Sequence, residues 1–236
     1  MSALSGLKAW VKRRESPLAR LAYGMATGAR TARLPVIRPL HRVLYAAQLG
    51  VRQALAETMR AIWWTPLFVS RLETDAPGLY LYSGMPQVLG PLRIRVGRGV
   101  RMSGLSTQIG RTGTPAAPLL EIGDNVDIGW QCTLSVGRRI VVGDNVRLAG
   151  KIMLAGFPGH PMNAADRAAG LPDTPDQVGD IVLERDVWLA TGVTVLAGVT
   201  IGAGTVVAAG SVVTRDLPAG VLAAGVPARV VRTLAP

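Results

Sequence analysis

An aliphatic residue recurs at every sixth position near the C-terminal end of this chain, at Leu183, Leu189, Val195, Ile201, Val207 and Val213. A period of six is neither the alternation of a half-buried strand nor the 3.6-residue period of a helix. It is typical of short strands joined by tight turns, with three hexapeptides in each coil of a triangular solenoid. The sequence therefore predicts a mainly β fold, a left-handed parallel β-helix, with the aliphatic residues pointing inward.

The same pattern extends toward the N-terminus. The repeated aliphatic positions are Ile122, Ile128 and Leu134, and, after a two-residue shift at Arg138–Arg139, Val142, Leu148 and Leu154. The segments Gly123–Asn125 and Gly143–Asn145 occupy equivalent turns, where Asn and Gly tolerate a left-handed backbone. We expect the β-helix over residues 94–232, preceded by a Gly-, Pro- and Tyr-rich connecting segment over residues 72–93.

The regular coil stops at Gly156 and restarts near Ile181, which predicts an inserted loop over residues 156–180. Long insertions in compact domains usually serve a function, because ordering them costs entropy. His160, one of only two histidines, lies in this loop between Gly159 and Pro161. Imidazole accepts a proton near neutral pH, so His160 is a candidate general base. From spacing alone, a surface histidine without a role remains the alternative.

Residues 1–71 form a basic N-terminal arm with twelve Lys or Arg and two Glu, a net charge of +10 out of +11 for the whole chain. Apolar residues at helical spacing predict amphipathic helices over residues 3–14 and 40–62. Such helices suit an anionic membrane surface. Packing of the arm on the solenoid or across an oligomer stays open as the alternative. Nucleic-acid binding is not expected, because no recognition motif accompanies the charge.

The single cysteine, Cys132, excludes an internal disulfide, and no signal-peptide pattern follows the N-terminal basic residues. We therefore expect a cytoplasmic protein, peripheral on the inner face of the membrane if the arm binds lipid. Residues 187–214 carry no charge, but their Val, Thr and Gly content favours β-coils over a membrane-spanning helix. Cys132 falls on an inward position, so it is expected to pack rather than to act as a nucleophile.

The stretch from Gly143 to Arg232 resembles the hexapeptide-repeat O-acetyltransferases, the group of galactoside, maltose and nodulation-factor acetyltransferases. The motifs that carry the resemblance are Gly143-Asp144-Asn145-Val146, Gly159-His160-Pro161, Asp186-Val187-Trp188-Leu189, Ala209-Gly210-Ser211-Val212-Val213-Thr214-Arg215-Asp216-Leu217-Pro218 and Ala224-Gly225-Val226-Pro227-Ala228-Arg229-Val230-Val231-Arg232.

This resemblance implies direct acyl transfer from acetyl-CoA or another acyl-CoA to a hydroxyl, with His160 as the base that removes the hydroxyl proton. It also implies a homotrimer with sites between neighbouring solenoids. The residues implied to contact the donor are Thr191, Ala209, Arg215, Arg229 and Arg232. Arginine suits this role because its guanidinium matches phosphate. An acyl carrier protein stays open as the alternative donor.

The sequence departs from the family at Ile128–Gln131, where the sugar acetyltransferases carry a polar, Asn-containing turn. Gln131 is a candidate replacement for that amide, and Trp130 and Trp188 are candidate walls of the acceptor site. The long basic arm resembles that of the surface-polysaccharide acyltransferases, so the expected acceptor is a sugar or a glycolipid or polysaccharide precursor.

Two other functions are compatible with a β-helix of this kind. A γ-type carbonic anhydrase needs three histidines around a metal, whereas His160 is alone in the solenoid, so no metal site is expected. A non-catalytic solenoid scaffold, whose basic arm binds an anionic membrane or an acidic partner, remains the alternative to an enzyme.

Overall fold

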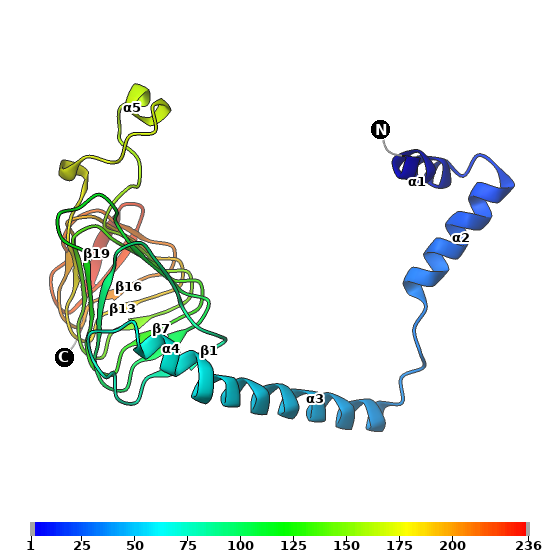
Figure 1. Ribbon diagram of the computed structural model, residues 1–236, viewed down its shortest axis with the longest axis horizontal. Coiled ribbons are helices and arrows are strands. Elements are labelled where there is room, and N and C mark those ends of the chain that lie inside the picture. Colours follow the sequence, from blue (N-terminus) through cyan, green and yellow to red (C-terminus); the bar gives the residue numbers. More distant parts are fainter. Residues whose placement is uncertain (1–2, 235–236) are drawn as a thin grey trace. The chain divides into compact units, whose positions relative to one another are not determined.

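The computed structural model describes residues 3–234 and divides the chain into two compact units, Met1–Arg52 and Gln53–Pro236 (Figure 1). The first unit contains α1 (Ala3–Arg13), α2 (Pro17–Thr31) and most of α3 (Arg38–Met59). Ser16 caps α2, since its hydroxyl accepts a hydrogen bond from the Ala19 amide at 3.1 Å. The helices expected over residues 3–14 and 40–62 are thus present. No helix within residues 3–234 is both long enough and apolar enough to cross a bilayer.

The second unit is a three-sided solenoid in which each coil contributes one strand to each of three parallel sheets. Sheet A contains β1 (Tyr80–Tyr82), β4 (Arg101–Ser103), β7 (Asp127–Ile128), β10 (Arg147–Leu148), β13 (Trp188–Leu189), β16 (Val206–Val207), β18 (Val221–Gly225) and the antiparallel β19 (Ala228–Thr233). Sheet B contains β2 (Gln87–Leu89), β5 (Thr107–Gly110), β8 (Thr133–Val136), β11 (Met153–Ala155), β14 (Thr194–Leu196) and β17 (Val212–Val213). Sheet C contains β3 (Arg93–Val96), β6 (Leu119–Ile122), β9 (Arg139–Val142), β12 (Ile181–Leu183) and β15 (Thr200–Ile201).

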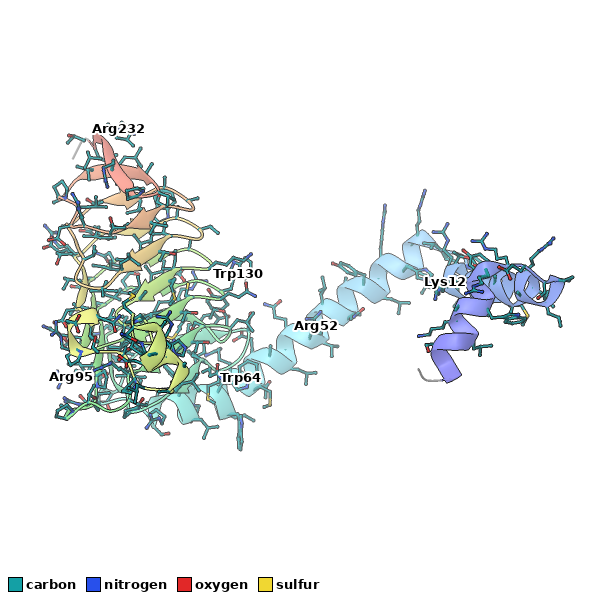
Figure 2. All side chains as sticks on the ribbon, turned by 90° about the horizontal axis from the view of Figure 1, so that it is seen from above. Lys12, Arg52, Trp64, Arg95, Trp130 and Arg232 are labelled. Carbon is teal, nitrogen blue, oxygen red and sulfur yellow. The ribbon has the colours of Figure 1, made fainter. Side chains whose placement is uncertain are left out.

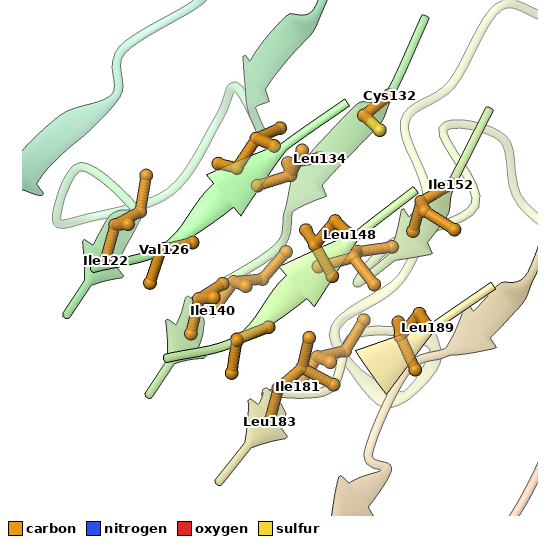
Figure 3. Close-up of a cluster of buried hydrophobic side chains, with 14 of the residues drawn as sticks. Ile122, Val126, Cys132, Leu134, Ile140, Leu148, Ile152, Ile181, Leu183 and Leu189 are labelled. Atoms are coloured by element: carbon orange, nitrogen blue, oxygen red, sulfur yellow. The ribbon is translucent and has the colours of Figure 1, made fainter. Parts of the chain in front are cut away.

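The chain passes from sheet A to B to C in every coil, so the turns stack along three edges of the prism, here named the A–B, B–C and C–A edges. The six aliphatic residues of the hexapeptide repeat are fully buried inside the prism. Figure 3 shows one of them, Leu189, stacked on Leu148 of the preceding coil. The left-handed parallel β-helix predicted from the period is confirmed.

The turns along the C–A edge have the predicted left-handed backbone. Asn125 and Asn145 have φ of 54° and 60°, and Asp186 in the next coil has φ of 63°. Their side chains form a ladder, in which the Asn125 amide donates to Asn145 Oδ1 at 2.8 Å and the Asn145 amide donates to Asp186 Oδ1 at 2.9 Å. Asn and Asp therefore meet both requirements of this edge, the unusual φ and a hydrogen-bonding group for the next coil.

The solenoid begins earlier than residue 94. β1 pairs with β4, and β2 pairs with β5, so the predicted connecting segment already supplies two sides of the first coil. The hexapeptide signature is weak there because Leu81 is the one fully buried residue of those two strands, while Tyr80, Tyr82 and the residues of β2 are partly or largely exposed.

The arm also ends earlier than residue 71. A π-helical turn η1 (Arg60–Trp64) and α4 (Thr65–Val69) follow α3, and Phe68 is 2% exposed within the solenoid core. Tyr80 donates to Glu57 Oε1 at 2.7 Å, and this bond, followed by that of Arg60, lowers the pKa of the Glu57 carboxyl. Residues 53–71 therefore close the first coil, because the open end of a β-helix needs an apolar cover.

The insertion over residues 156–180 is present between β11 and β12 and leaves the solenoid at the B–C edge. It contains α5 (Ala164–Ala168) and a 3-10 turn, η2 (Pro175–Gln177), so it is more ordered than a structureless loop. Asn163 caps α5 by accepting the Ala165 amide at 2.8 Å. In Figure 1, α5 projects away from the coils.

Candidate functional site

His160 lies on the part of the insertion that has just left the B–C edge, and its side chain is exposed to solvent. Gly159 before it has φ of +80°, a conformation that glycine adopts without strain. Among the described residues, none donates a hydrogen bond to the imidazole or accepts one from it. The base candidate is therefore presented to solvent.

A buried ion pair fastens this loop to the solenoid. Arg111, which directly follows β5, donates from Nε to Asp173 Oδ1 at 2.5 Å and from a terminal nitrogen to the Asp173 carbonyl at 2.8 Å. The second carboxylate oxygen of Asp173 accepts the backbone amide of Gly159 at 3.1 Å. The Arg111 and Asp173 side chains are only 12% and 4% exposed. This Arg111–Asp173 clasp thus holds the backbone immediately before His160.

Four aspartates lie in the loop with His160, and an aspartate can orient a catalytic imidazole. None of Asp166, Asp173, Asp176 and Asp180 bonds to the His160 ring within the described part of the chain. Asp180 instead accepts Arg138 Nε at 3.2 Å in an exposed pair. The clasp was missed from sequence because Arg111 and Asp173 are 62 residues apart, and neither lies in a repeat motif.

Three of the predicted site residues stack along the A–B edge, in the order Trp130, Thr191, Ala209. Backbone bonds link the coils here, from Lys151 N to the Trp130 carbonyl at 2.8 Å and from Gly210 N to the Thr191 carbonyl at 2.9 Å. Thr191 and Ala209 therefore occupy the same turn of successive coils.

Trp130 is 46% exposed, and its indole packs over Gly150 of the next coil. A Cβ atom at Gly150 would meet the Trp130 indole nitrogen at 2.5 Å, so a larger residue there would require the ring to move. The Lys151 ammonium lies 5.1 Å from the ring centroid. Gln131 has φ of 56° in the turn. Trp188, in contrast, is half exposed on the outer face of sheet A, in register with Arg147, and does not lie on the A–B edge.

The three predicted donor-binding arginines lie in three different places. Arg229 on β19 pairs with Ala224, which lies toward the A–B edge on β18, the strand next to β16 in sheet A. Arg215 lies in the B–C turn between β17 and Leu217, on the same edge as the insertion. Arg232 pairs with Leu222 toward the C–A edge, at the C-terminal end of the solenoid in Figure 2. A single chain therefore does not gather the predicted donor contacts into one pocket.

A groove of about 700 Å³ lies on the outer face of sheet C, and its lining contains none of the predicted site residues. Three of its charged side chains pair with each other, since Glu121 contacts both Arg95 and Arg139. Figure 2 shows Arg95 on the side of the solenoid opposite Trp130. No group of three His, Cys, Asp or Glu placed to hold a metal ion occurs within residues 3–234.

Cys132 is fully buried, which confirms the packing role expected for it. Burial raises the pKa of its thiol to about 11. The reactive species is the thiolate, which is scarce at neutral pH under these conditions.

We expect Cys132 in the folded protein to react with a thiol reagent at least tenfold more slowly than free cysteine at pH 8, and at an ordinary rate in denaturant. Labelling followed by absorbance checks this, with the denatured protein as the control. Fast labelling of the folded chain would contradict the buried position. Because the folded pKa is raised, the stability contributed by the protonated thiol is lost as the pH rises through about 11.

Part of the sequence is similar to a protein family and to individual known proteins. Residues 180–215 match the family described as bacterial transferase hexapeptide (six repeats). Galactoside O-acetyltransferase of Escherichia coli (strain K12) is 36% identical over 116 residues, which cover 49% of this chain and 54% of that protein. An acetyltransferase candidate of Saccharomyces cerevisiae, YJL218W, is 40% identical over 114 residues, covering 48% and 55%. The match thus spans about half the length of these curated relatives.

A solved structure shares the fold. The N-acyltransferase AntD from Bacillus cereus, in complex with dTDP and 3-hydroxybutyryl-CoA, superposes with a TM-score of 0.57. The two chains are 16% identical, and the superposition covers 72% of this chain and 88% of AntD. This likeness supports the β-helix assignment.

Proposed function

We propose that this chain, whose residues 180–215 carry the bacterial transferase hexapeptide repeat, is an acyl-CoA-dependent O-acyltransferase. It would transfer an acetyl group from acetyl-CoA to a hydroxyl of a sugar or of a glycolipid or polysaccharide precursor. The observation that carries the proposal is His160, exposed on a loop whose backbone is held by the buried Arg111–Asp173 clasp.

In this mechanism the imidazole of His160 removes the proton from the acceptor hydroxyl as the oxygen attacks the thioester carbonyl. A carbon–oxygen bond forms, the carbon–sulfur bond breaks, and the thiolate of coenzyme A leaves. The imidazolium returns its proton to that thiolate or to water. No covalent acyl-enzyme is needed, which agrees with the buried position of Cys132.

The separation of the two edges supports a homotrimer. His160 and Arg215 lie along the B–C edge, whereas Thr191 and Ala209 lie along the A–B edge, across the width of sheet B. A donor that contacts both sets needs the B–C edge of one copy beside the A–B edge of another. A cyclic trimer brings such edges together three times.

The donor and acceptor classes rest on chemistry and on relatives. The exposed arginines Arg215, Arg229 and Arg232 suit the phosphates of coenzyme A. A carrier-protein donor would present a phosphopantetheine arm instead. Galactoside O-acetyltransferase is named for a sugar acceptor, and the AntD structure holds dTDP. Gln131, Trp130 and Trp188 remain the acceptor-side candidates.

Calorimetric titration with acetyl-CoA tests the proposal, with free coenzyme A and ATP as comparisons. We expect saturable binding of one acetyl-CoA per chain and a ten- to hundredfold weaker Kd for Arg229→Ala, because a hydrogen bond to a charged group contributes about 1.5–3 kcal/mol. Arg98→Ala, at the exposed C–A edge, is the matched control and should bind normally. If no coenzyme A species binds, the carrier-protein donor or the non-catalytic scaffold would be favoured.

A further inference from the structure

The first unit, residues 3–52, has an apolar helix face that no part of that unit covers. None of the α3 residues is buried. At 100° per residue, Leu40, Val43, Leu44 and Val51 fall on one side of α3, and each is at least half exposed.

The cations of α3 lie away from this stripe. Arg38 and Arg42 fall opposite it and Arg52 lies on its flank, with Tyr45 and Leu49 between them. Figure 2 shows Arg52 on α3 and Lys12 on α1. An apolar stripe opposite cations is the pattern of helices that lie in the plane of a membrane interface.

The pair α1–α2 repeats this combination. A groove of about 460 Å³ between them is lined by Leu7, Val11, Tyr23, Ala26 and Thr27, with Lys8, Lys12 and Arg30 around it. Trp10, on the same helix as Leu7, is 42% exposed. Arg14 stacks over the Tyr23 ring at 3.6 Å and so fixes the turn between the helices. Indole at the boundary between polar and apolar surroundings is a common membrane-interface anchor.

The net charge of residues 1–52 indicates what kind of partner covers these apolar helix faces. Residues 1–52 contain ten Lys or Arg and one Glu, a net charge of +9. Among the described residues, none of these ten cations forms an ion pair with a carboxylate. Covering the arm with a second copy of itself would bring like charges together, whereas an anionic bilayer would neutralise them.

We propose that residues 3–52 bind anionic lipid bilayers, with the apolar faces of α1, α2 and α3 at the acyl boundary and the basic side chains against the headgroups. The helices lie on the bilayer, since none within the described part of the chain can cross it. This proposal does not depend on the acyl-transfer activity.

The test is sedimentation of the full-length protein with vesicles of phosphatidylcholine alone or with one-third phosphatidylserine. We expect binding to the anionic vesicles only, and at least a tenfold fall in partitioning at high salt. Two variants separate the two faces, namely Arg38→Gln/Arg42→Gln/Arg52→Gln and Leu44→Ser/Val51→Ser. Each should reduce binding at least tenfold. Arg98→Gln/Arg185→Gln, two exposed arginines of the solenoid, is the matched control and should bind as the parent does.

Light scattering of the lipid-free protein and circular dichroism accompany the test. Arm variants with unchanged helix content and normal vesicle binding would overturn the proposal. So would equal binding to both vesicle types, which indicates apolar adsorption without charge selection. An oligomer that dissociates when Leu44 and Val51 are replaced, together with no sedimentation on anionic vesicles, would instead assign the face to contacts between copies.

Discussion

Replacing His160 with alanine should lower kcat for acyl transfer by about 10²- to 10⁴-fold, the usual contribution of a positioned general base. The loss should be confined to chemistry. His160 is exposed and forms no hydrogen bond among the described residues, so its removal leaves the fold and the Thr191–Ala209 edge intact. We therefore expect an unchanged Kd for acetyl-CoA and an unchanged thermal midpoint.

Initial rates of coenzyme A release, with a hydroxyl acceptor that has first been found for the parent protein, measure this effect. His41→Ala is the matched control, because the other histidine lies on α3, where its ring nitrogen bonds to the Ile37 carbonyl of the same segment. Full activity of His160→Ala would exclude the imidazole as base and require another group to accept the proton.

Replacing Asp173 with alanine should have the second large effect, on both the loop and the rate. The change leaves the 12% exposed Arg111 guanidinium without its carboxylate and removes the acceptor of the Gly159 amide. Breaking a buried pair in this way costs roughly 3–5 kcal/mol. Part of that loss is recovered if the loop opens and lets water reach Arg111. We therefore expect faster proteolysis within residues 157–178, a lower unfolding midpoint and a kcat reduced at least tenfold.

The matched control breaks an exposed pair at the same edge. Arg138 and Asp180 are 64% and 47% exposed, and such pairs contribute about 0–1 kcal/mol. Arg138→Gln should therefore leave proteolysis and kcat unchanged. A positioning role predicts that Asp173→Ala lowers kcat while the Kd for acetyl-CoA stays constant, and that Asp173→Asn recovers part of the rate. Equal losses of kcat in Arg138→Gln and Asp173→Ala would contradict the role given to the clasp. So would a rate of proteolysis in Asp173→Ala equal to that of the parent protein.

The fold could be predicted because the β-helix is a local rule repeated many times. In successive coils the equivalent aliphatic residues, such as Leu189 and Val207, face inward, and the equivalent turn residues Asn125 and Asn145 share a left-handed backbone. Each hexapeptide therefore indicates the fold independently of the others. The prediction failed at the first coil, where Tyr80–Tyr82 and Gln87–Leu89 have few buried positions. It also placed residues 53–71 in the arm, although Phe68 packs into the solenoid core.

The candidate site was predictable only as far as short motifs reach. The Gly159-His160-Pro161 motif and the turn positions of Thr191 and Ala209 could be found from the sequence alone. Their roles in catalysis and donor binding, like the trimer, stay predictions. Whether motifs distant in sequence meet depends on which prism edge each turn occupies, and Arg215 and Arg229 proved to lie near different edges.

The period, the architecture, the position of the insertion and the basic amphipathic arm could all be predicted from the residue pattern, because each depends on residues close together in the chain. Three further features became visible in the folded chain: Arg111 holds Asp173 beside Gly159, Trp130 covers Gly150, and His160 and Thr191 lie on separate edges. Such pairings follow from how coils stack, and stacking brings together residues whose separation in sequence carries no periodic signal.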